Sequence, residues 1–356
     1  MIADLRAFCL GPAATLLEAM RCIDRNALGI VLVVDDERRL LYTITDGDLR
    51  RAILGGLSLE RSIAEWARDR TEMGNSRPIT APIDADPADM RALIQPLGLR
   101  HLPLVDAEGR LAGLALSSDL LSEADVPVTA VVMAGGRGER LSPLTLDTPK
   151  PMLPVGDRPL LEHIVGQLKA AGVRQVSVTT HYRGETIVNH FGDGQRFGLD
   201  IDYVNEAQPL GTAGGLGLLP RWQSTLLVVN GDILTSVNYQ SMIAFHRENR
   251  AAMTVAVRQY RVPVPYGVVS TDGVDIRSIS EKPTIQFFTN AGVYLLEPAV
   301  REYVPVGARL EMPDLITAVI AAGERVVSFP ISEYWLDIGQ RDDYEQAQMD
   351  VKHGTR

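Results

Sequence analysis

The middle of the chain carries two short motifs whose residue types suit the binding of phosphate groups. The first is Gly135-Gly136-Arg137-Gly138-Glu139-Arg140, which directly follows the apolar run Val128–Met133. Clustered glycines leave backbone N–H groups unobstructed, so several of them can converge on one anion. In the second motif, Lys150 stands between two prolines, which exclude it from a regular helix interior. A fixed cation beside a glycine-rich loop predicts a site for a triphosphate.

Neither of the two commonest glycine-rich phosphate motifs fits this loop. A dinucleotide-binding fingerprint would place a third glycine near Leu141, and a P-loop would continue as Gly-Lys-Ser/Thr. No His-Glu-x-x-His, Cys-x-x-Cys or Gly-x-Ser-x-Gly motif occurs in the sequence. The chain therefore offers no competing catalytic chemistry of these kinds.

An acidic residue follows a buried strand further along the chain. Asn230-Gly231-Asp232 comes directly after Leu226–Val229, a short apolar run typical of a fully buried strand. A carboxylate at the carboxyl end of such a strand projects into the crevice where open α/β sheets bind ligands. Magnesium binds one or two carboxylates together with phosphate oxygens and water, so Asp232 is a candidate metal ligand.

These motifs need a sheet whose strands end at one edge. From Val128 onward, apolar strands alternate with loops and helical segments, which predicts a mostly parallel sheet covered by helices. The expected elements are strands over Val128–Met133, Val173–Thr180 and Leu226–Val229, helices over Pro159–Ala171 and Gln340–Asp350, and a hairpin over Val268–Ile279.

The first third of the chain contains an internal repeat. Leu28–Leu49 aligns without gaps onto Leu99–Leu120 at an offset of 71 residues, so that Asp48 falls on Asp119. Each copy has the pattern of a helix, an apolar strand, a polar turn, a second strand and another helix. We expect one domain over residues 1–122 and a second over 128–356, joined by the polar connector Leu121–Val128.

Composition sets the broad class of protein. The 356 residues suit about two domains of roughly 150 residues, and 46% hydrophobic with 22% charged residues is typical of globular proteins. A net charge of −10 argues against a nucleic-acid partner. No apolar run suits a membrane span or signal peptide, so we expect no membrane partner and a cytoplasmic protein. Cys9 and Cys22 are too few for a disulfide framework.

Lysine is scarce among the basic residues. Of 35 lysines and arginines, the lysines are Lys150, Lys169, Lys282 and Lys352. Lys150 and Lys282 each precede a proline. A compact ammonium is not interchangeable with a planar guanidinium, so these two positions are candidates for sites where lysine itself is required.

The phosphate motifs resemble the signature of the sugar-1-phosphate nucleotidylyltransferases. The family pattern Gly-x-Gly-x-Arg-x-x-Pro-Leu-Thr…Pro-Lys-Pro stands here at Gly136–Thr145 and Pro149–Pro151. Later landmarks follow in family order, so the resemblance covers Val128–Asp350. It implies a Rossmann-like, mostly parallel α/β domain. The nucleotide-binding residues that it implies are Ala134, Gly135, Gly136, Gly138, Glu206, Leu210, Gly211 and Thr212.

The same resemblance implies a catalytic set, a metal site and a sugar site. Asp232 and Asp337, the latter in Trp335-Leu336-Asp337-Ile338-Gly339, would bind Mg²⁺. The implied catalytic residues are Arg140, Lys150, Asp232, Lys282 and Asp337. The implied sugar-binding residues are Tyr266, Gly267, Glu281, Asn290 and Gly292.

The repeat in the first third resembles a pair of CBS domains, which are α+β units, over about residues 8–122. In that family a Ser/Thr-x-x-Asp sequence at a strand-to-helix junction holds ribose hydroxyls, and Thr45 and Asp48 match it. The second copy keeps Asp119 but has Leu116 in the hydroxyl position. The resemblance implies an adenine nucleotide on the first copy. The alternative is a dimerisation scaffold without a ligand.

Together these resemblances predict an enzyme that makes NDP-sugar and pyrophosphate from an NTP and a sugar-1-phosphate. A CBS pair joined to this catalytic domain resembles the guanylyltransferases of nonulosonic (legionaminic) acid pathways, which implies GTP and glucosamine-1-phosphate as substrates. Mannose-1-phosphate guanylyltransferase, glucose-1-phosphate thymidylyl- or uridylyltransferase and a phosphocholine-type cytidylyltransferase remain open. A nucleotide-sensing CBS regulatory protein with an inactive transferase domain is the alternative from another class. We expect a homo-oligomer, because CBS pairs commonly associate.

Overall fold

The computed structural model describes residues 2–26, 28–72, 78–97, 99–120 and 128–354. The chain separates into two compact units, Met1–Val126 and Pro127–Arg356. The expected connector lies outside the described residues up to residue 127. No helix in the described part of the chain is long and apolar enough to cross a membrane.

The N-terminal unit consists of two three-stranded sheets with helices packed against them. Its first half contains β1 (Cys9–Leu10), α1 (Leu16–Asn26), β2 (Ile30–Val34), β3 (Leu40–Thr45), α2 (Asp46–Leu54) and α3 (Ile63–Glu72). Its second half contains β4 (Ala81–Pro82), α4 (Pro87–Leu97), β5 (His101–Val105), β6 (Leu111–Leu116) and α5 (Ser117–Leu120).

The two halves of this unit fold alike, position by position. In each sheet the first strand is parallel to the second, and the second is antiparallel to the third. The ladders have a register shift at Val33/Val34 and at Leu104/Val105, 71 residues apart. Arg38 and Gly109 occupy the equivalent turn position with positive φ. The repeat in the sequence is therefore a repeat of backbone geometry.

The C-terminal unit is built on a seven-stranded sheet in the order β11-β10-β7-β12-β17-β14-β18. All neighbouring pairs in it are parallel except the two made by β17. This confirms the expected fold class, a mostly parallel α/β sheet. The strands of the sheet are β7 (Val128–Met133), β10 (Gln175–Thr180), β11 (Asp200–Asn205), β12 (Thr225–Asn230), β14 (Met253–Pro263), β17 (Thr284–Leu296) and β18 (Val326–Ile331).

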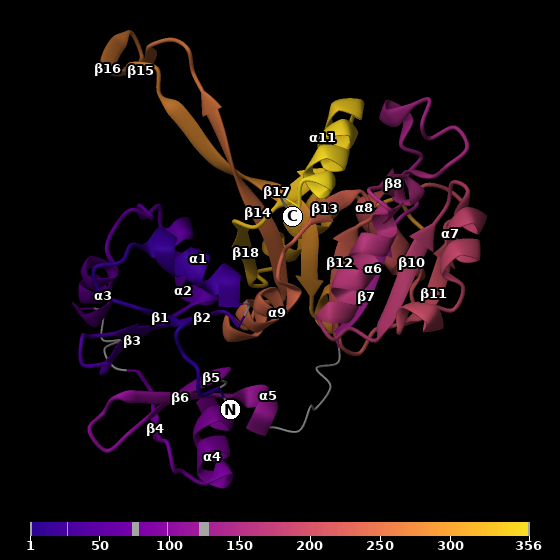
Figure 1. Cartoon of the computed structure of the whole chain (residues 1–356). Helices are drawn as coiled ribbons and strands as arrows, with labels where there is room; N and C mark the ends of the chain where they lie inside the picture. The colour runs from indigo at the N-terminus through magenta and orange to yellow at the C-terminus, as the bar shows by residue number, and fades with distance from the viewer. Residues whose placement is uncertain (1, 27, 73–77, 98, 121–127, 355–356) are drawn as a thin grey trace. The chain divides into compact units, whose positions relative to one another are not determined.

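Helices and short ladders surround this sheet (Figure 1). The helices are α6 (Leu160–Ala170), α7 (Gly184–Phe191), α8 (Gly211–Gly214), α9 (Tyr239–Glu248), α10 (Met312–Ala321) and α11 (Arg341–Lys352). The short strands are β8 (Pro154–Val155), β9 (Arg158–Pro159), β13 (Ile233–Thr235), β15 (Val268–Asp272), β16 (Asp275–Ser280) and β19 (Trp335–Asp337). The expected helices and hairpin agree with α6, α11 and β15–β16 to within a few residues.

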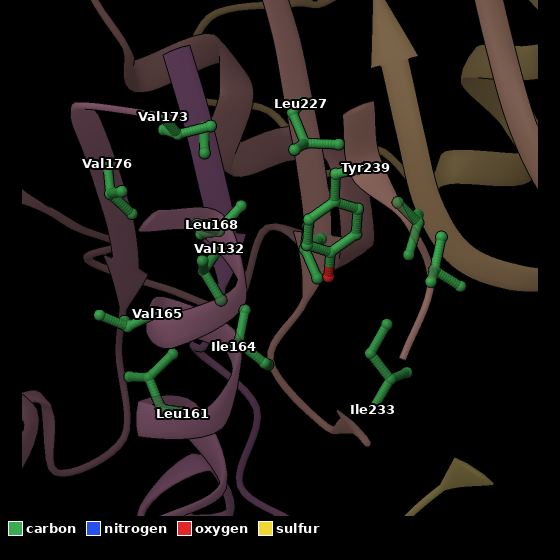
Figure 2. Packing of buried hydrophobic residues seen from close by; sticks show 14 of the residues in the cluster. Val132, Leu161, Ile164, Val165, Leu168, Val173, Val176, Leu227, Ile233 and Tyr239 are labelled. Carbon is green, nitrogen blue, oxygen red and sulfur yellow. The ribbon is translucent and has the colours of Figure 1, made fainter. Parts of the chain in front are cut away.

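Alternation along the central strands gives the sheet a core on each face. In β7, Val132 packs in one cluster and Val131 in the other, because successive side chains of a strand point to opposite faces. Figure 2 shows the first cluster, in which Leu161, Ile164 and Leu168 of α6 pack against the sheet. Burial on both faces explains why β7 and β12 read as nearly continuous apolar runs.

An arm of the C-terminal unit extends away from the sheet (Figure 1). It consists of residues 258–289, which are the outer parts of β14 and β17 and the hairpin β15–β16 at the tip. The arm exposes many large apolar side chains, namely Tyr260, Val262, Tyr266, Val268, Val269, Val274, Ile276, Ile279, Ile285, Phe287 and Phe288.

Candidate functional site

The carboxyl edge of the sheet brings the two predicted metal ligands together. Strands β13 and β19 pair antiparallel, with Ile233 opposite Asp337. The backbone N–H of Ile338 also donates to the Asp232 carbonyl oxygen over 3.0 Å. This ladder holds Asp232 and Asp337 side by side, although they lie far apart in the sequence.

Lys150 reaches both carboxylates from the proline-flanked turn Lys150–Met152. Its Nζ donates to Asp232 Oδ2 over 2.7 Å and lies 4.0 Å from Asp337 Oδ1. Only 7% of Lys150 is exposed, whereas both carboxylates are more accessible to solvent. The structure therefore brings together three of the predicted catalytic residues, Lys150, Asp232 and Asp337.

The glycine loop packs directly on this lysine. Gly138 has a φ of 65°, and a Cβ there would lie 2.9 Å from Lys150 Cβ. Thr145 Oγ1 donates to the Gly138 carbonyl over 2.9 Å and fixes the turn. Arg140 follows in a short 3₁₀ turn, with its guanidinium close to Gly339 just beyond Asp337. The loop, Arg140 and Lys150 thus form one cationic wall beside the carboxylates.

The pKa of Asp337 reflects the balance of charges in this cluster. Burial and the neighbouring Asp232 raise the pKa of the Asp337 carboxyl above its ordinary value, and Lys150 and Arg140 only partly oppose this. Burial also raises the pKa of the nearby Tyr294 to about 12. Two adjacent carboxylates repel each other, so the site favours additional positive charge.

These residues fit a magnesium ion that also binds phosphate. Within the described ranges, no group of three His, Cys, Asp or Glu side chains could hold a metal ion by itself. Asp232 and Asp337 supply two carboxylates at one edge of the sheet. Magnesium commonly binds one or two carboxylates and completes its octahedron with phosphate oxygens and water. The donor set suits a metal that arrives with a phosphate ligand.

Four of the predicted nucleotide-binding residues, Glu206, Leu210, Gly211 and Thr212, lie in a packed segment next to the glycine loop. Glu206 is 4% exposed, and its Oε2 accepts from the Leu210 N–H over 3.0 Å. Its other carboxylate oxygen lies where side chains at Gly135 and Gly215 would otherwise extend. Glu206 therefore connects the glycine loop to the loop that precedes α8.

Gly211 and Gly214 in α8 are small for a structural reason that the sequence did not reveal. A Cβ at Gly211 or Gly214 would lie 2.7 Å from a backbone carbonyl oxygen of the segment 308–310. Thr212 Oγ1 donates to Glu311 Oε2 and accepts from the Met312 N–H, which connects the loop to the start of α10. The side chain of Leu210 is buried in the protein interior.

The predicted sugar-binding residues fall into two groups. Asn290 and Gly292 lie close to the carboxylates, since Gly292 N–H donates to Asn290 Oδ1 and a Cβ on Gly292 would meet the Asn230 amide. Tyr266, Gly267 and Glu281, together with the predicted catalytic residue Lys282, instead flank the hairpin at the outer end of the arm (Figure 1). There Glu281 faces Gly267, and Lys282 has a φ of 44°. The structure thus assembles the first group with the carboxylates and leaves the second on the arm.

His181 is a site neighbour that the sequence reading missed. It directly follows β10, and its Nδ1 lies 2.8 Å from the Glu206 carbonyl oxygen. Its Cβ is 3.5 Å from the position of a Cβ on Gly135. The available signal was its place at the end of a strand parallel to β7, because the carboxyl ends of such strands meet at one edge.

In the N-terminal unit, Thr45 and Asp48 bind each other. Thr45 caps α2, and the Asp48 carboxylate accepts from the Thr45 N–H and hydroxyl over 2.9 and 2.8 Å. Arg51 also donates to Asp48 over 2.8 Å. The pair forms a capping box, which stabilises the start of a helix.

A glycine loop, paired carboxylates and a buried lysine at the carboxyl edge of a mostly parallel sheet define a phosphate-handling α/β domain. Sequence comparison identifies the family to which this domain belongs. The sequence model of the nucleotidyl transferase family matches residues 129–354, and the chain belongs to this family. The model of the CBS domain matches residues 2–55 and 71–125, so the N-terminal unit is a CBS pair.

Individual relatives point the same way. Mannose-1-phosphate guanylyltransferase of Mycobacterium tuberculosis is 36% identical over 236 residues, 64% of this chain and 65% of that protein. UTP–glucose-1-phosphate uridylyltransferase of Synechocystis sp. is 32% identical over 239 residues, 61% of this chain and 62% of that protein. The chain spans less than two thirds of the length of these relatives.

A solved structure is also similar to this chain. A protein from Bacillus anthracis assigned as a glucose-1-phosphate thymidylyltransferase, in complex with a sucrose, superposes with a TM-score of 0.52 at 26% identity. The similarity covers 62% of this chain and 94% of that chain.

Proposed function

We propose that the protein is a sugar-1-phosphate nucleotidylyltransferase, which converts an NTP and a sugar-1-phosphate into NDP-sugar and pyrophosphate. The observation that carries this proposal is the convergence of Lys150, Asp232 and Asp337 beside a glycine loop. The family membership and the names of the relatives agree with it.

The chemistry requires positioning and charge neutralisation. An oxygen of the sugar phosphate forms a bond to the α-phosphorus of the NTP, and the bond to the departing pyrophosphate breaks. The attacking phosphate oxygen is ionised at neutral pH, so no general base is needed. Backbone N–H groups of Gly135–Gly138 hold the triphosphate, while Arg140 and Lys150 offset charge on the leaving group. Lys282 holds the attacking phosphate against repulsion by the NTP.

Asp232 and Asp337 would hold a magnesium ion in this proposal. When bound, magnesium neutralises phosphate charge and orients the reacting groups. The two carboxylates keep their positions through the β13–β19 ladder, and Arg140 stands beside them. The glycine loop keeps its shape through the Thr145 hydroxyl.

Our preferred substrates are GTP and glucosamine-1-phosphate, on the combination of a CBS pair with this catalytic domain. Mannose-1-phosphate with GTP and glucose-1-phosphate with UTP or dTTP are the alternatives, which the names of the relatives support. Since NTPs are supplied in the cytoplasm, we propose that the reaction takes place there.

The deciding experiment is pyrophosphate release measured for each of four NTPs with each of several sugar-1-phosphates. Release with one pair, dependent on Mg²⁺ and lost in Asp232→Asn, supports the proposal. An absence of release with every pair, together with retained nucleotide binding, favours a nucleotide-sensing protein with an inactive transferase domain.

We further propose that an adenine nucleotide binds the first CBS domain at Thr45 and Asp48 and tunes the transferase, and that the protein is a homo-oligomer. Thr45→Ser retains a capping hydroxyl, whereas Asp48→Asn removes the carboxylate that would accept ribose hydroxyls. Loss of ATP binding in Asp48→Asn, with Thr45→Ser unaffected, supports the site. Equal ATP binding and kinetics in both variants and the unmodified chain contradict it.

A further inference from the structure

A cation already stands between the two predicted metal ligands. The Lys150 ammonium is 2.7 Å from Asp232 Oδ2 and 4.0 Å from Asp337 Oδ1. Lys150 is buried and Arg140 lies close by, and the charges of both oppose the repulsion that Asp232 and Asp343 exert on Asp337. The repulsion between the carboxylates is thereby reduced by the protein's own side chain.

We propose that Lys150 is the resident cation of this site, which a divalent metal must displace, so that metal and triphosphate bind cooperatively. This inference rests on the proposed nucleotide and metal site. It adds a second role for Lys150 besides contact with phosphate. In this role Lys150 holds the two carboxylates together and opposes the binding of a metal without nucleotide.

The competition follows from the shared oxygen atom. Magnesium sits about 2.0–2.1 Å from its oxygen ligands, and the ammonium now donates to Asp232 Oδ2. Two cations on one carboxylate oxygen repel each other strongly in a partly buried site. A metal that binds this oxygen therefore competes with Lys150 for Asp232.

The released ammonium has a limited set of destinations. Pro149 and Pro151 restrict the backbone around Lys150, and Gly138 packs against its Cβ and Cδ, so only the outer side chain is free to move. The adjacent feature is the glycine loop, where the triphosphate is expected. A triphosphate there gives Lys150 a new anion, whereas metal alone leaves the ammonium without one. The coupling is reciprocal, since each ligand raises the affinity of the other.

Manganese titration of the nucleotide-free full chain tests the competition directly. Lys150→Met should bind Mn²⁺ more tightly than the unmodified chain, on the order of tenfold, which is typical of coupling between sites. Lys352→Met, which removes an exposed lysine on α11, should bind Mn²⁺ as the unmodified chain does. Lys150→Arg, which keeps the positive charge, should not bind Mn²⁺ more tightly than the unmodified chain. Equal or weaker binding by Lys150→Met overturns the proposal.

Two more variants separate this role from general electrostatics and from the metal site itself. Arg140→Met removes a neighbouring charge that makes no contact with Asp232 Oδ2. It should therefore tighten Mn²⁺ binding less than Lys150→Met does, and an equal effect overturns the proposal.

Asp232→Asn should weaken Mn²⁺ binding. If it weakens binding while Lys150→Met has no effect, only this inference fails. If Asp232→Asn changes nothing, the proposed metal site fails as well.

The scarcity of lysine allows a second test on the unmodified protein. Amine-reactive labelling followed by mass spectrometry can follow each of the four lysines separately. Lys150 should react slowly in the free protein, faster with Mg²⁺ alone, and slowly again with Mg²⁺ and inorganic tripolyphosphate. Exposed Lys169 and Lys352 serve as internal references. A Lys150 rate that Mg²⁺ leaves unchanged overturns the proposal.

Discussion

Asp232 and Asp48 are both carboxylates that follow a strand within three residues, but their hydrogen-bond partners differ in kind. Asp232 is bound by Lys150, 82 positions away in the sequence. Asp48 is bound by Thr45 and Arg51, each three positions away. The first arrangement exists only when the sheet is assembled, while the second needs little more than one helix turn.

This difference in partners indicates whether each carboxylate contributes to stability or to activity. A local capping box stabilises the helix that it begins. A buried lysine that converges with two carboxylates from separate strands gains little stability, because desolvation offsets the attraction between the charges. We therefore expect substitutions at Lys150 and Asp232 to affect activity, and substitutions at Thr45 and Asp48 to affect the stability of the N-terminal unit.

The largest expected effect is on turnover. Lys150→Ala or Asp232→Asn should lower pyrophosphate release by at least ~10²-fold, the scale of a lost electrostatic stabiliser. Initial rates at saturating substrates measure this, with Lys352→Ala as the control that removes a lysine outside the site. Near-normal pyrophosphate release by either site variant would contradict the assignment of Lys150 and Asp232 as catalytic residues. The contrast between an active-site carboxylate and a helix-capping carboxylate would then fail.

The second expected effect is a pH-dependent loss of stability in the N-terminal unit. Burial lowers the pKa of His101 in β5 to about 4, from an ordinary value of 6.5. The unfolded chain takes up this proton first, so stability is present above pH 6.5 and is lost as the pH falls toward 4. At pH 5 the loss is about 2 kcal/mol.

Proteolysis in urea at pH 7 and pH 5, with peptides from each unit separated by mass spectrometry, measures this loss. His101→Gln, which cannot take up the proton, should show a smaller pH dependence in the N-terminal peptides. Peptides of the C-terminal unit serve as the internal control. An unchanged pH dependence in His101→Gln would assign the effect to another group.

Much of the fold could be predicted because the signal is local. Burial of β7 and β12 on both faces produces apolar runs at the expected positions, and Asp272-Gly273 marks the hairpin turn. The repeat was readable because both copies preserve the same turn, with Asp35 and Asp106 accepting from equivalent backbone N–H groups. Such features depend on neighbours within a few positions.

The rest depends on partners far along the chain. The family resemblance implied that Gly211 binds nucleotide, but it did not indicate that the backbone of residues 308–310 fills the space beside Gly211 and Gly214. The ion pair of Lys150 with Asp232 requires the β13–β19 ladder and the turn after Pro149 to be in place. The sequence indicated a hairpin near the tip of the arm but not the separation of Lys282 from Lys150.

The third prediction concerns Lys150 and Lys282, the two lysines that each precede a proline. Lys282 is exposed on the arm, unlike the buried Lys150. Lys282→Ala should raise the KM for the sugar-1-phosphate about tenfold, the order of one charged hydrogen bond in a solvated setting. Steady-state kinetics at varied sugar-1-phosphate measure it, with Lys169→Ala as control. A fall in kcat as large as that of Lys150→Ala would show that Lys282 stabilises the transition state as well as binding the sugar phosphate, and the expected contrast between the two lysines would then be wrong.

The smallest expected effect is on the helix cap of the first CBS domain. Thr45→Ala removes the hydroxyl that accepts from the Asp48 N–H, and this should lower the unfolding free energy of the N-terminal unit by about 1 kcal/mol. Thr45→Ser should retain most of it, since serine caps equally well. Urea unfolding with peptide-level detection measures the stability, and pyrophosphate release measures activity in the same samples. Unchanged stability in Thr45→Ala would show that the capping box contributes little. A turnover change common to Thr45→Ala and Thr45→Ser, measured without adenine nucleotide, would show that this local pair influences the transferase site independently of the proposed ligand.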